Sequence, residues 1–333
     1  DWLNKQKKLT MKGYAKPLHE FIEGHKIQFV IPVYQRNYDW LIDNCDQLFS
    51  DLVKLSRSNR CSHFFGSIVT SSADSSYNRL VIDGQQRLTT ISLLLLAGIK
   101  AVKDGAIEIS EESKIDEAYE VFLKAKFCNS ERKIKLVPIE NDRIAYDKIF
   151  NEEDSFDEDS KVTRNYRHFY DLLTRKPQAL SFDQLLDAIE RLQIISIELD
   201  SDDDAQLIFE SLNSTGLALT EADKIRNYLL MSLTSEELHM CFKNYWQKIE
   251  QATENQPTKF LRDYLTIQQQ LQRPVRQSNI YYEWKKYMDG HDRKEELVKM
   301  LDYAHYYQQV TEAKLSTAKL SEKMRHICNI ETD

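Results

Sequence analysis

The sequence predicts an α+β fold, in which a small mixed sheet with helices is followed by an all-helical extension. Strand-like and helix-like segments alternate up to about residue 200, whereas every segment after about residue 235 has helical periodicity. Only 8 Gly and 6 Pro occur among the 333 residues, which disfavours sandwiches and barrels with many turns. A chain of this length can form two domains, or one domain with a large appendage.

The composition argues against several classes of protein. No apolar run approaches the ~20 residues that cross a bilayer, and the first residues lack the apolar centre of a signal peptide. The 5 cysteines are scattered singly, which indicates reduced thiols in a cytoplasmic protein rather than disulfides or a CxxC metal site. The net charge of -8 means that any contact with nucleic acid must be local.

Four segments are predicted as strands. Residues 29–35 are largely apolar and lead into a polar loop. Residues 63–71 and 79–84 are joined by the polar turn SSADSSYN. Residues 192–200 are rich in Ile and make the last strand. The sheet is therefore expected within the first two thirds of the chain.

The helices are predicted from the spacing of apolar residues. Residues 85–102 are apolar nearly all round, so this helix is expected to be central and buried. The section from about 111 to 191 reads as helical and polar. A helix over residues 204–213 precedes a loop and a second helix that begins at Thr220, where Asp223 completes a capping-box pattern.

The strongest chemical signal is VIDGQQRLTT, residues 81–90, which has the pattern of strand, tight turn and helix N-terminus. Gly84 allows close approach of the backbone, and the unpaired N–H groups of the first helical turn favour an anion. Arg87 can hold a phosphate bidentately, and Asp83 is placed to bind Mg²⁺. One of the two glutamines could orient a water for attack on a γ-phosphate. The structural alternative is that Asp83 caps the helix and Arg87 pairs with a neighbouring acid.

A second segment, IPVYQRNYDW (residues 31–40), interleaves aromatic residues with Gln35 and Arg36. On a strand, these two polar side chains face opposite ways. Such a mixture suits stacking on a base with hydrogen bonds to its edge or to a phosphate. Tyr38 and Trp40 are expected to pack in the core or as a lid, whereas Gln35 and Arg36 are expected in the site.

The third segment covers residues 205–227. Asn213 and Gly216 end the first of its helices, and a capping role explains both. Asp223 lies one helical turn before Arg226, so the two side chains are neighbours. A salt bridge and a role in a site are equally good interpretations of that pair.

These segments, in the order YQRxYxW, FGSIV, IDGQQRLTT and IFESLNxxGxxLxxxDxIRN, resemble the N-terminal domain family of GmrSD-type modification-dependent restriction endonucleases over about residues 14–230. The resemblance implies a ParB/sulfiredoxin-like fold, in which a GxxR turn at a helix N-terminus binds nucleotide phosphates. It also implies a domain over residues 14–234 with a helical insertion at about 105–190, and a helical extension over 235–333.

The resemblance implies Mg²⁺ and a nucleoside triphosphate of unknown identity as cofactors. The predicted catalytic residues are Gln35, Asp83, Gln86 and Arg87, with Asp83 as the metal ligand. The predicted nucleotide-binding residues are Arg36, Gly84, Gln85, Arg87, Thr89, Thr90 and Asn213.

The function implied is a nucleotide-hydrolysing module of a DNA restriction or anti-phage defence protein, which gates recognition of DNA or a linked nuclease. A non-enzymatic sensor of modified DNA and a protein-interaction adaptor are the alternatives. The eight histidines form no cluster of the kind that an HNH nuclease needs. The sequence leaves open whether a nuclease module follows residue 333 and whether the chain forms homo-oligomers.

Overall fold

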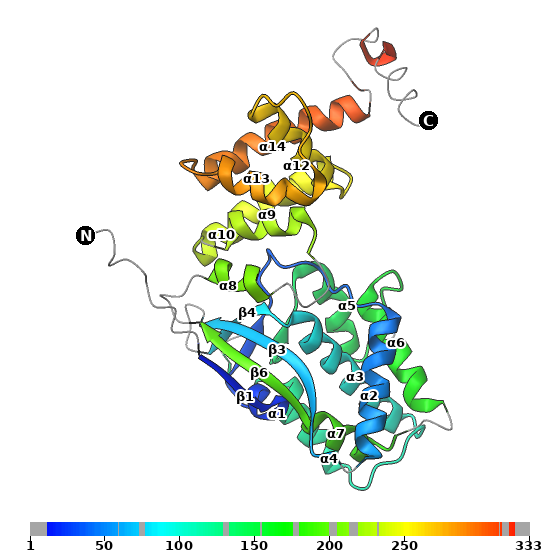
Figure 1. Cartoon of the computed structure of the whole chain (residues 1–333). Helices are drawn as coiled ribbons and strands as arrows, with labels where there is room; N and C mark the ends of the chain where they lie inside the picture. Colours follow the sequence, from blue (N-terminus) through cyan, green and yellow to red (C-terminus); the bar gives the residue numbers. More distant parts are fainter. Residues whose placement is uncertain are drawn as a thin grey trace, which may run out of the picture. The chain divides into compact units, whose positions relative to one another are not determined.

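A computed structural model describes residues 12–58, 60–72, 77–128, 133–153, 155–175, 180–199, 205–212, 219–231, 233–312, 314 and 320–323 of the chain (Figure 1). The chain divides into two compact units, residues 1–209 and 210–333. The division falls inside α8 (Ala205–Leu212), whereas the motif pattern of the sequence places its domain boundary at residue 234.

The first unit is built on a six-stranded mixed sheet with the strand order β1-β6-β3-β4-β2-β5. Its strands are β1 (Lys12–Pro17), β2 (Gln28–Val30), β3 (His63–Ser72), β4 (Asn78–Asp83), β5 (Leu136–Val137) and β6 (Leu192–Leu199). In the centre of the sheet, β3 pairs antiparallel with β4 and parallel with β6. The strands predicted at 63–71, 79–84 and 192–200 are confirmed.

Three features of the sheet differ from the prediction. The strand expected over residues 29–35 ends at Val30, because Pro32 has no N–H to donate and its carbonyl accepts the N–H of Gln35 at 2.9 Å in a turn. Strands β1 and β5 are additional. They carry little local signal because β1 is an edge strand with Tyr14 61% exposed, and β5 has two residues.

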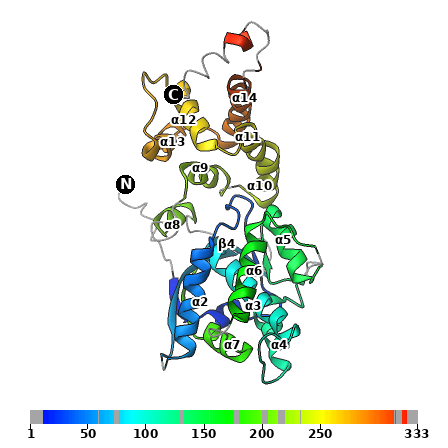
Figure 2. The same ribbon diagram turned by 90° about the vertical axis from the view of Figure 1, so that its right-hand side faces the viewer.

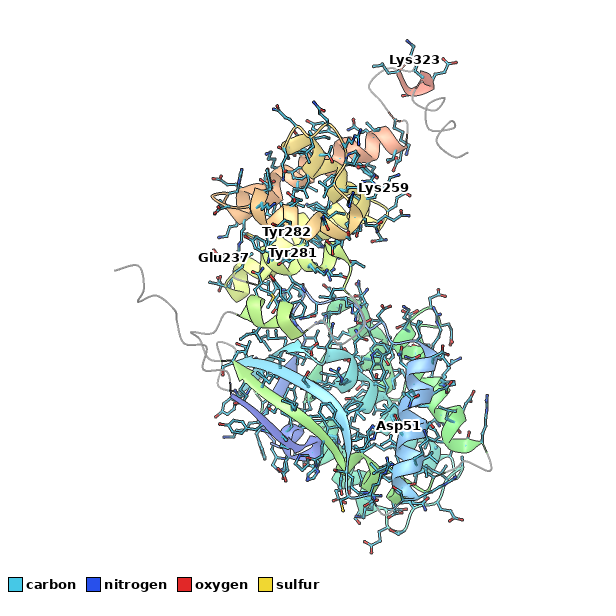
Figure 3. The ribbon with its side chains drawn as sticks, in the orientation of Figure 1. Asp51, Glu237, Lys259, Tyr281, Tyr282 and Lys323 are labelled. Atoms are coloured by element: carbon cyan, nitrogen blue, oxygen red, sulfur yellow. The ribbon has the colours of Figure 1, made fainter. Side chains whose placement is uncertain are left out.

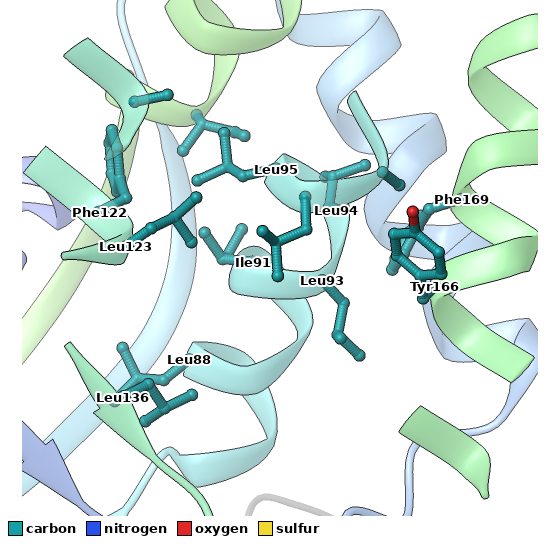
Figure 4. Close-up of a cluster of buried hydrophobic side chains, with 14 of the residues drawn as sticks. Leu88, Ile91, Leu93, Leu94, Leu95, Phe122, Leu123, Leu136, Tyr166 and Phe169 are labelled. Carbon is teal, nitrogen blue, oxygen red and sulfur yellow. The ribbon is translucent and has the colours of Figure 1, made fainter. Parts of the chain in front are cut away.

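The helices of the first unit are α1 (Leu18–Ile22), α2 (Ile42–Ser56), α3 (Gln85–Lys103), α4 (Ser113–Ala118), the π-helical turn η1 (Tyr119–Leu123), α5 (Glu140–Phe150), α6 (Lys161–Thr174) and α7 (Phe182–Glu190). Helix α3 is central and buried, as predicted. Figure 4 shows Leu88 of α3 beside Leu136 of β5, and Leu94 on the side of α6 with Phe169.

The helical section at about 105–190 shares the core of the sheet domain. Helix α6 packs against α3 and α2, and α7 packs against α2 (Figure 2). The buried side chains of these helices belong to one cluster with those of α3 and the sheet. Removal of this section would therefore expose the core of the unit.

The second unit is helical throughout its described residues. After α8 it contains α9 (Glu221–Leu230), α10 (Ser235–Cys241), the π-helical turn η3 (Phe242–Trp246), α11 (Gln247–Ala252), α12 (Pro257–Gln268), the 3₁₀ turn η4 (Gln277–Asn279), α13 (Ile280–Tyr287) and α14 (Arg293–Thr311). The predicted capping box is confirmed, since Thr220 Oγ1 accepts the Asp223 N–H at 3.1 Å.

Aromatic side chains fill the interior of this helical unit. Trp246 and Trp284 are fully buried, and the Tyr264 hydroxyl donates to buried Glu296 at 2.5 Å. Tyr282 is 58% exposed, whereas the hydroxyl of Tyr281 donates to Glu210 (Figure 3). In the part of the chain that the structure describes, no helix is both long and apolar enough to cross a membrane.

Candidate functional site

The turn between β4 and α3 requires glycine for two reasons. Gly84 has φ +93° and forms the N-cap of α3, and no side chain caps this helix. A Cβ on Gly84 would lie 3.0 Å from Ile68 Cγ1 and 3.2 Å from the Ser67 carbonyl oxygen. Backbone conformation and close packing therefore both exclude a larger residue. The first N–H groups of α3 have no partner within the helix, which makes this end attractive to an anion.

Arg87 lies in the first turn of α3 and is held by the neighbouring strand. Its Nη1 donates to the Ser67 carbonyl at 2.9 Å and lies 3.8 Å from Asp83 Oδ2. The guanidinium lies against Gly66, which has φ +122°. Three donors of the guanidinium remain for other partners beyond these two contacts.

Gly66 and Ser67 are site residues that the sequence analysis did not assign. They belong to the FGSIV segment, which is part of the family resemblance but whose residues were not predicted to have a function. The register of β3 against β6 shifts between Phe64 and Gly66. A glycine inside a strand signals such a bulge or a close approach of another group, and here both occur.

Asp83 combines partial burial with two neighbouring cations. Burial raises the pKa of its carboxyl above the ordinary value, while Arg87, the Gly84 N–H and Arg36 act in the opposite direction. The side chain is 22% exposed, so it can still reach a ligand. As the sequence predicts, Asp83 lies at the end of β4 and Arg87 in the first turn of α3, on either side of the turn at Gly84.

Two glutamines join the loop over residues 31–40 to this turn. Gln35 Nε2 donates to the carbonyl of Ile82 at 2.8 Å, and Gln85 Nε2 donates to Gln35 Oε1 at 3.3 Å. Both side chains are buried. The expectation that Gln35 and Arg36 lie on a strand is wrong, because the segment turns at Pro32.

Gln86 is occupied by the same loop. Its Oε1 accepts the N–H groups of Asp39 at 2.8 Å and Trp40 at 3.2 Å, and its Nε2 donates to the Asn37 carbonyl at 3.2 Å. The side chain is 8% exposed. Gln86 therefore fixes the shape of the loop over residues 37–40.

Thr89 and Thr90 lie in the interior. Thr90 Oγ1 donates to the Gln86 carbonyl at 2.7 Å and bonds the Tyr38 hydroxyl at 2.7 Å. Asn165 Nδ2, from α6, donates to the same hydroxyl at 3.0 Å and to the Trp40 carbonyl at 2.9 Å. Tyr38 is buried, as predicted, and this network connects α6 to the loop.

Charged groups surround the loop. Arg36 Nη1 lies 3.8 Å from Asp39 Oδ2, and Lys161 Nζ also bonds Asp39. Asp142 Oδ2 accepts the N–H of Tyr38 at 2.6 Å. Burial raises the pKa of the Asp142 carboxyl to about 6, although that hydrogen bond lowers it. Asp142 of α5 and Lys161 of α6 thus hold the loop, and the charge of Arg36 acts on the carboxyl of Asp83.

The third motif contributes less to this geometry. Asn213 and Gly216 lie outside the described residues. Arg226 is buried, with Nη2 at 2.7 Å from Asp223 Oδ1 and Nη1 at 3.0 Å from Glu250 Oε1. These ion pairs support the salt-bridge interpretation of Arg226. Among the described residues, no three His, Cys, Asp or Glu side chains gather as a metal cluster.

Fold and site together define a mixed α/β protein in which an uncapped helix N-terminus faces an arginine-bearing loop. Residues 18–230 match the family described as GmrSD restriction endonuclease, N-terminal domain. The chain therefore belongs to this family, which identifies a restriction- or defence-related protein. A comparison with curated proteins finds no match.

Proposed function

We propose that the first unit binds the phosphates of a nucleoside triphosphate at the N-terminus of α3 and hydrolyses the nucleotide, so that turnover gates recognition of DNA or a linked nuclease. The observation that carries this proposal is the pair of Arg87 and Asp83, 3.8 Å apart beside an uncapped helix end, with the charge of Arg36 acting on the same carboxyl. Two cations and free backbone N–H groups suit a polyanion. A ParB/sulfiredoxin-like fold is part of the proposal, supported by the strand, GxxR turn and helix.

In this proposal Arg87 is the main phosphate ligand. Its contacts with Ser67 and Asp83 orient the guanidinium and leave donors for phosphate oxygens. Gly84 lets the ligand approach the backbone. Arg36, from the loop over residues 31–40, adds a second cation for the phosphates.

Asp83 fits the role of a metal ligand. Mg²⁺ is commonly held by one or two carboxylates together with the phosphates of the substrate, and when bound it would neutralise charge at those phosphates. A single carboxylate that is 22% exposed beside the phosphate position meets that requirement. The like charge of a phosphate would favour the protonated form of Asp83, so binding should depend on pH when no cation is present.

The glutamines serve as positioning residues in this proposal. Orientation of a water by Gln86 would require its side chain to release the N–H groups of Asp39 and Trp40. Gln35 would similarly have to release the carbonyl of Ile82. Because both side chains are buried and hydrogen-bonded, we propose that they hold the loop in its conformation.

Phosphate release tests the proposal. The full chain is incubated with ATP, GTP, CTP or UTP and with Mg²⁺ or EDTA. Hydrolysis should require Mg²⁺ and should fall at least about a hundredfold in Arg87→Ala and Asp83→Ala, as is usual for groups that stabilise transition-state charge. Arg79→Ala is the matched control, since Arg79 lies on β4 with Asp83 and its partners among the described residues are Glu198 at 4.0 Å and Ser72.

Circular dichroism and thermal melting establish that each variant folds. Calorimetry with the four nucleotides distinguishes binding from turnover. If the folded wild-type chain neither binds nor hydrolyses any of them, the proposal is wrong.

A sensor of DNA phosphates without turnover is the second candidate. It is favoured by Arg87 and the free N–H groups at the start of α3, which suit the phosphate of a DNA backbone as well as that of a nucleotide. This candidate predicts salt-dependent DNA binding, weakened in Arg36→Ala, with no release of phosphate from any nucleotide.

A further inference from the structure

A polar cavity of about 390 Å³ lies in the helical unit, beyond the residues that match the family. It is lined by Gln256, Thr258, Lys259, Arg262, Gln277 and Ile280. These residues come from the start of α12, from η4 and from the first residue of α13. The lining contains two cations, two amides and a hydroxyl, but no carboxylate and no aromatic ring.

The cations at this cavity are poorly neutralised by the protein. In the described part of the chain no carboxylate pairs with Lys259, which is exposed (Figure 3), or with Arg273 and Arg276 of the adjoining loop. Arg262 is the exception, since its Nη2 lies 3.0 Å from Asp263 Oδ1.

Some other cations of the same unit have acidic partners. Lys224 pairs with Glu221 and Lys285 pairs with Glu210, at 2.6 and 2.9 Å. The uncompensated charge that gathers at the cavity would attract an anion.

The sequence beside the cavity strengthens this point. Residues 264–282 contain no Asp or Glu, although the chain as a whole has 53 of them and a net charge of -8. The same stretch carries Arg273, Arg276 and several glutamines. In an acidic protein, a carboxylate-free stretch with Arg and Gln suits a contact with nucleic acid.

We propose that this cavity binds a phosphate of the DNA backbone and that Arg273 and Arg276 extend the contact to neighbouring phosphates. A phosphodiester needs only cations and N–H or O–H donors, which the lining supplies. A free nucleotide would need a stacking surface for its base, and the lining offers only the side chain of Ile280. The inference rests on the proposed action on DNA but not on nucleotide hydrolysis.

Salt dependence of DNA binding tests the inference. Fluorescence anisotropy measures the affinity of the full chain for a 30-base-pair duplex, without nucleotide, at several salt concentrations. Each phosphate contact contributes about 0.9 to the slope of log K against log salt. The double variant Lys259→Gln/Arg262→Gln removes the contact with this one phosphate and should lower that slope by about 0.9, so that a rise from about 50 to about 200 mM salt weakens the wild type about threefold more than the variant.

Two further variants make the result specific to the cavity. Lys243→Gln/Lys248→Gln removes the same charge from exposed positions of the same unit and should leave the slope almost unchanged. Asp263→Asn frees Arg262 from its acidic partner and should tighten binding up to about fivefold, the equivalent of one surface ion pair.

The inference is overturned if the wild type does not bind the duplex, or if the two double variants change the slope equally. It is also overturned if millimolar inorganic phosphate, compared with chloride at equal ionic strength, displaces the duplex, because the cavity would then be a site for free phosphate. The Lys259→Gln/Arg262→Gln variant should keep nucleotide turnover, and Arg87→Ala should keep the salt slope. Failure of one proposal is thus distinguishable from failure of the other.

Discussion

The guanidinium of Arg87 lies directly against the Cα of Gly66. A Cβ at Gly66 would be 2.6 Å from Arg87 Nε and 2.8 Å from Arg87 Cζ, well inside van der Waals contact. The glycine of one motif thus provides the space for the arginine of another, although the two are far apart in the sequence. This explains why a glycine occurs in the middle of β3, where it weakens the strand.

Gly66→Ala should therefore displace Arg87 and weaken nucleotide binding at least about tenfold, the equivalent of one charge-assisted hydrogen bond. Gly24→Ala is the matched control, because Gly24 has φ +132° but its added Cβ would meet only the side chain of Ile27. Both variants carry backbone strain, and only one touches the site. Calorimetry with the nucleotide that the wild type binds checks this, and equal affinities in the two variants would contradict it.

Gln86 is expected to contribute to stability through the loop that it holds. Gln86→Leu leaves the N–H groups of Asp39 and Trp40 without their acceptor, at a cost of about 1–3 kcal/mol for each group that stays buried. We expect the free energy of unfolding in urea to fall by about 2 kcal/mol or more. Gln47→Leu on the surface of α2 should change it by less than about 0.5 kcal/mol. A similar small loss in Gln86→Leu would show that the loop does not depend on this side chain.

Much of the fold can be predicted from the sequence wherever the signal is local. The strand pair 63–71 and 79–84 and the buried helix after it are set by apolar pattern and length. Strand β5 could not be predicted, because two residues carry no periodicity and their pairing with β2 depends on the folded chain. Pro32 indicates that β2 should end early, because proline cannot donate a hydrogen bond to a neighbouring strand. The apolar residues around Pro32 instead favour a longer strand.

The site divides in the same way. The meeting of the DGQQR turn with the YQR loop could be expected from the two motifs. The partners of Gln35 and Gln86 could not, because Gln86 bonds backbone groups and Gln35 bonds a backbone carbonyl as well as the side chain of Gln85. Asn165 carries no motif signal at all. Its role follows only from the packing of α6 against α3, which brings its amide to Tyr38.

Asp142 should make stability depend on pH. Burial raises the pKa of its carboxyl from 3.8 to about 6 in the folded chain. As pH rises through this window the unfolded chain loses its proton first, so the free energy of unfolding should fall between about pH 4 and pH 6. Asp142→Asn removes the titrating carboxyl, and with it this pH dependence, while keeping an acceptor for the N–H of Tyr38.

Urea unfolding of the wild type and Asp142→Asn at pH 4, 5, 6 and 7 checks this expectation. The wild type should lose on the order of 2 kcal/mol relative to the variant across the window. Asp171→Asn serves as the control, since Asp171 lies on the surface of α6 and pairs with the exposed side chain of Arg175. A difference between wild type and Asp142→Asn that does not vary with pH would rule out a buried carboxyl at this position.

Tyr264 and Glu296 should be energetically coupled in the core of the helical unit. The Tyr264 hydroxyl donates to Glu296 Oε1 at 2.5 Å, and both side chains are almost completely buried. Tyr264→Phe leaves a buried carboxyl with one partner fewer, and Glu296→Leu leaves a hydroxyl without its acceptor. Each change should lower the free energy of unfolding by about 1–3 kcal/mol, whereas the double variant should lose less than the sum because no polar group is then left over.

A double-mutant cycle should give a coupling energy of about 1–3 kcal/mol. The exposed pair Lys285 and Glu210 provides the comparison, with a coupling below about 1 kcal/mol, and equal values for the two pairs would contradict the buried bond.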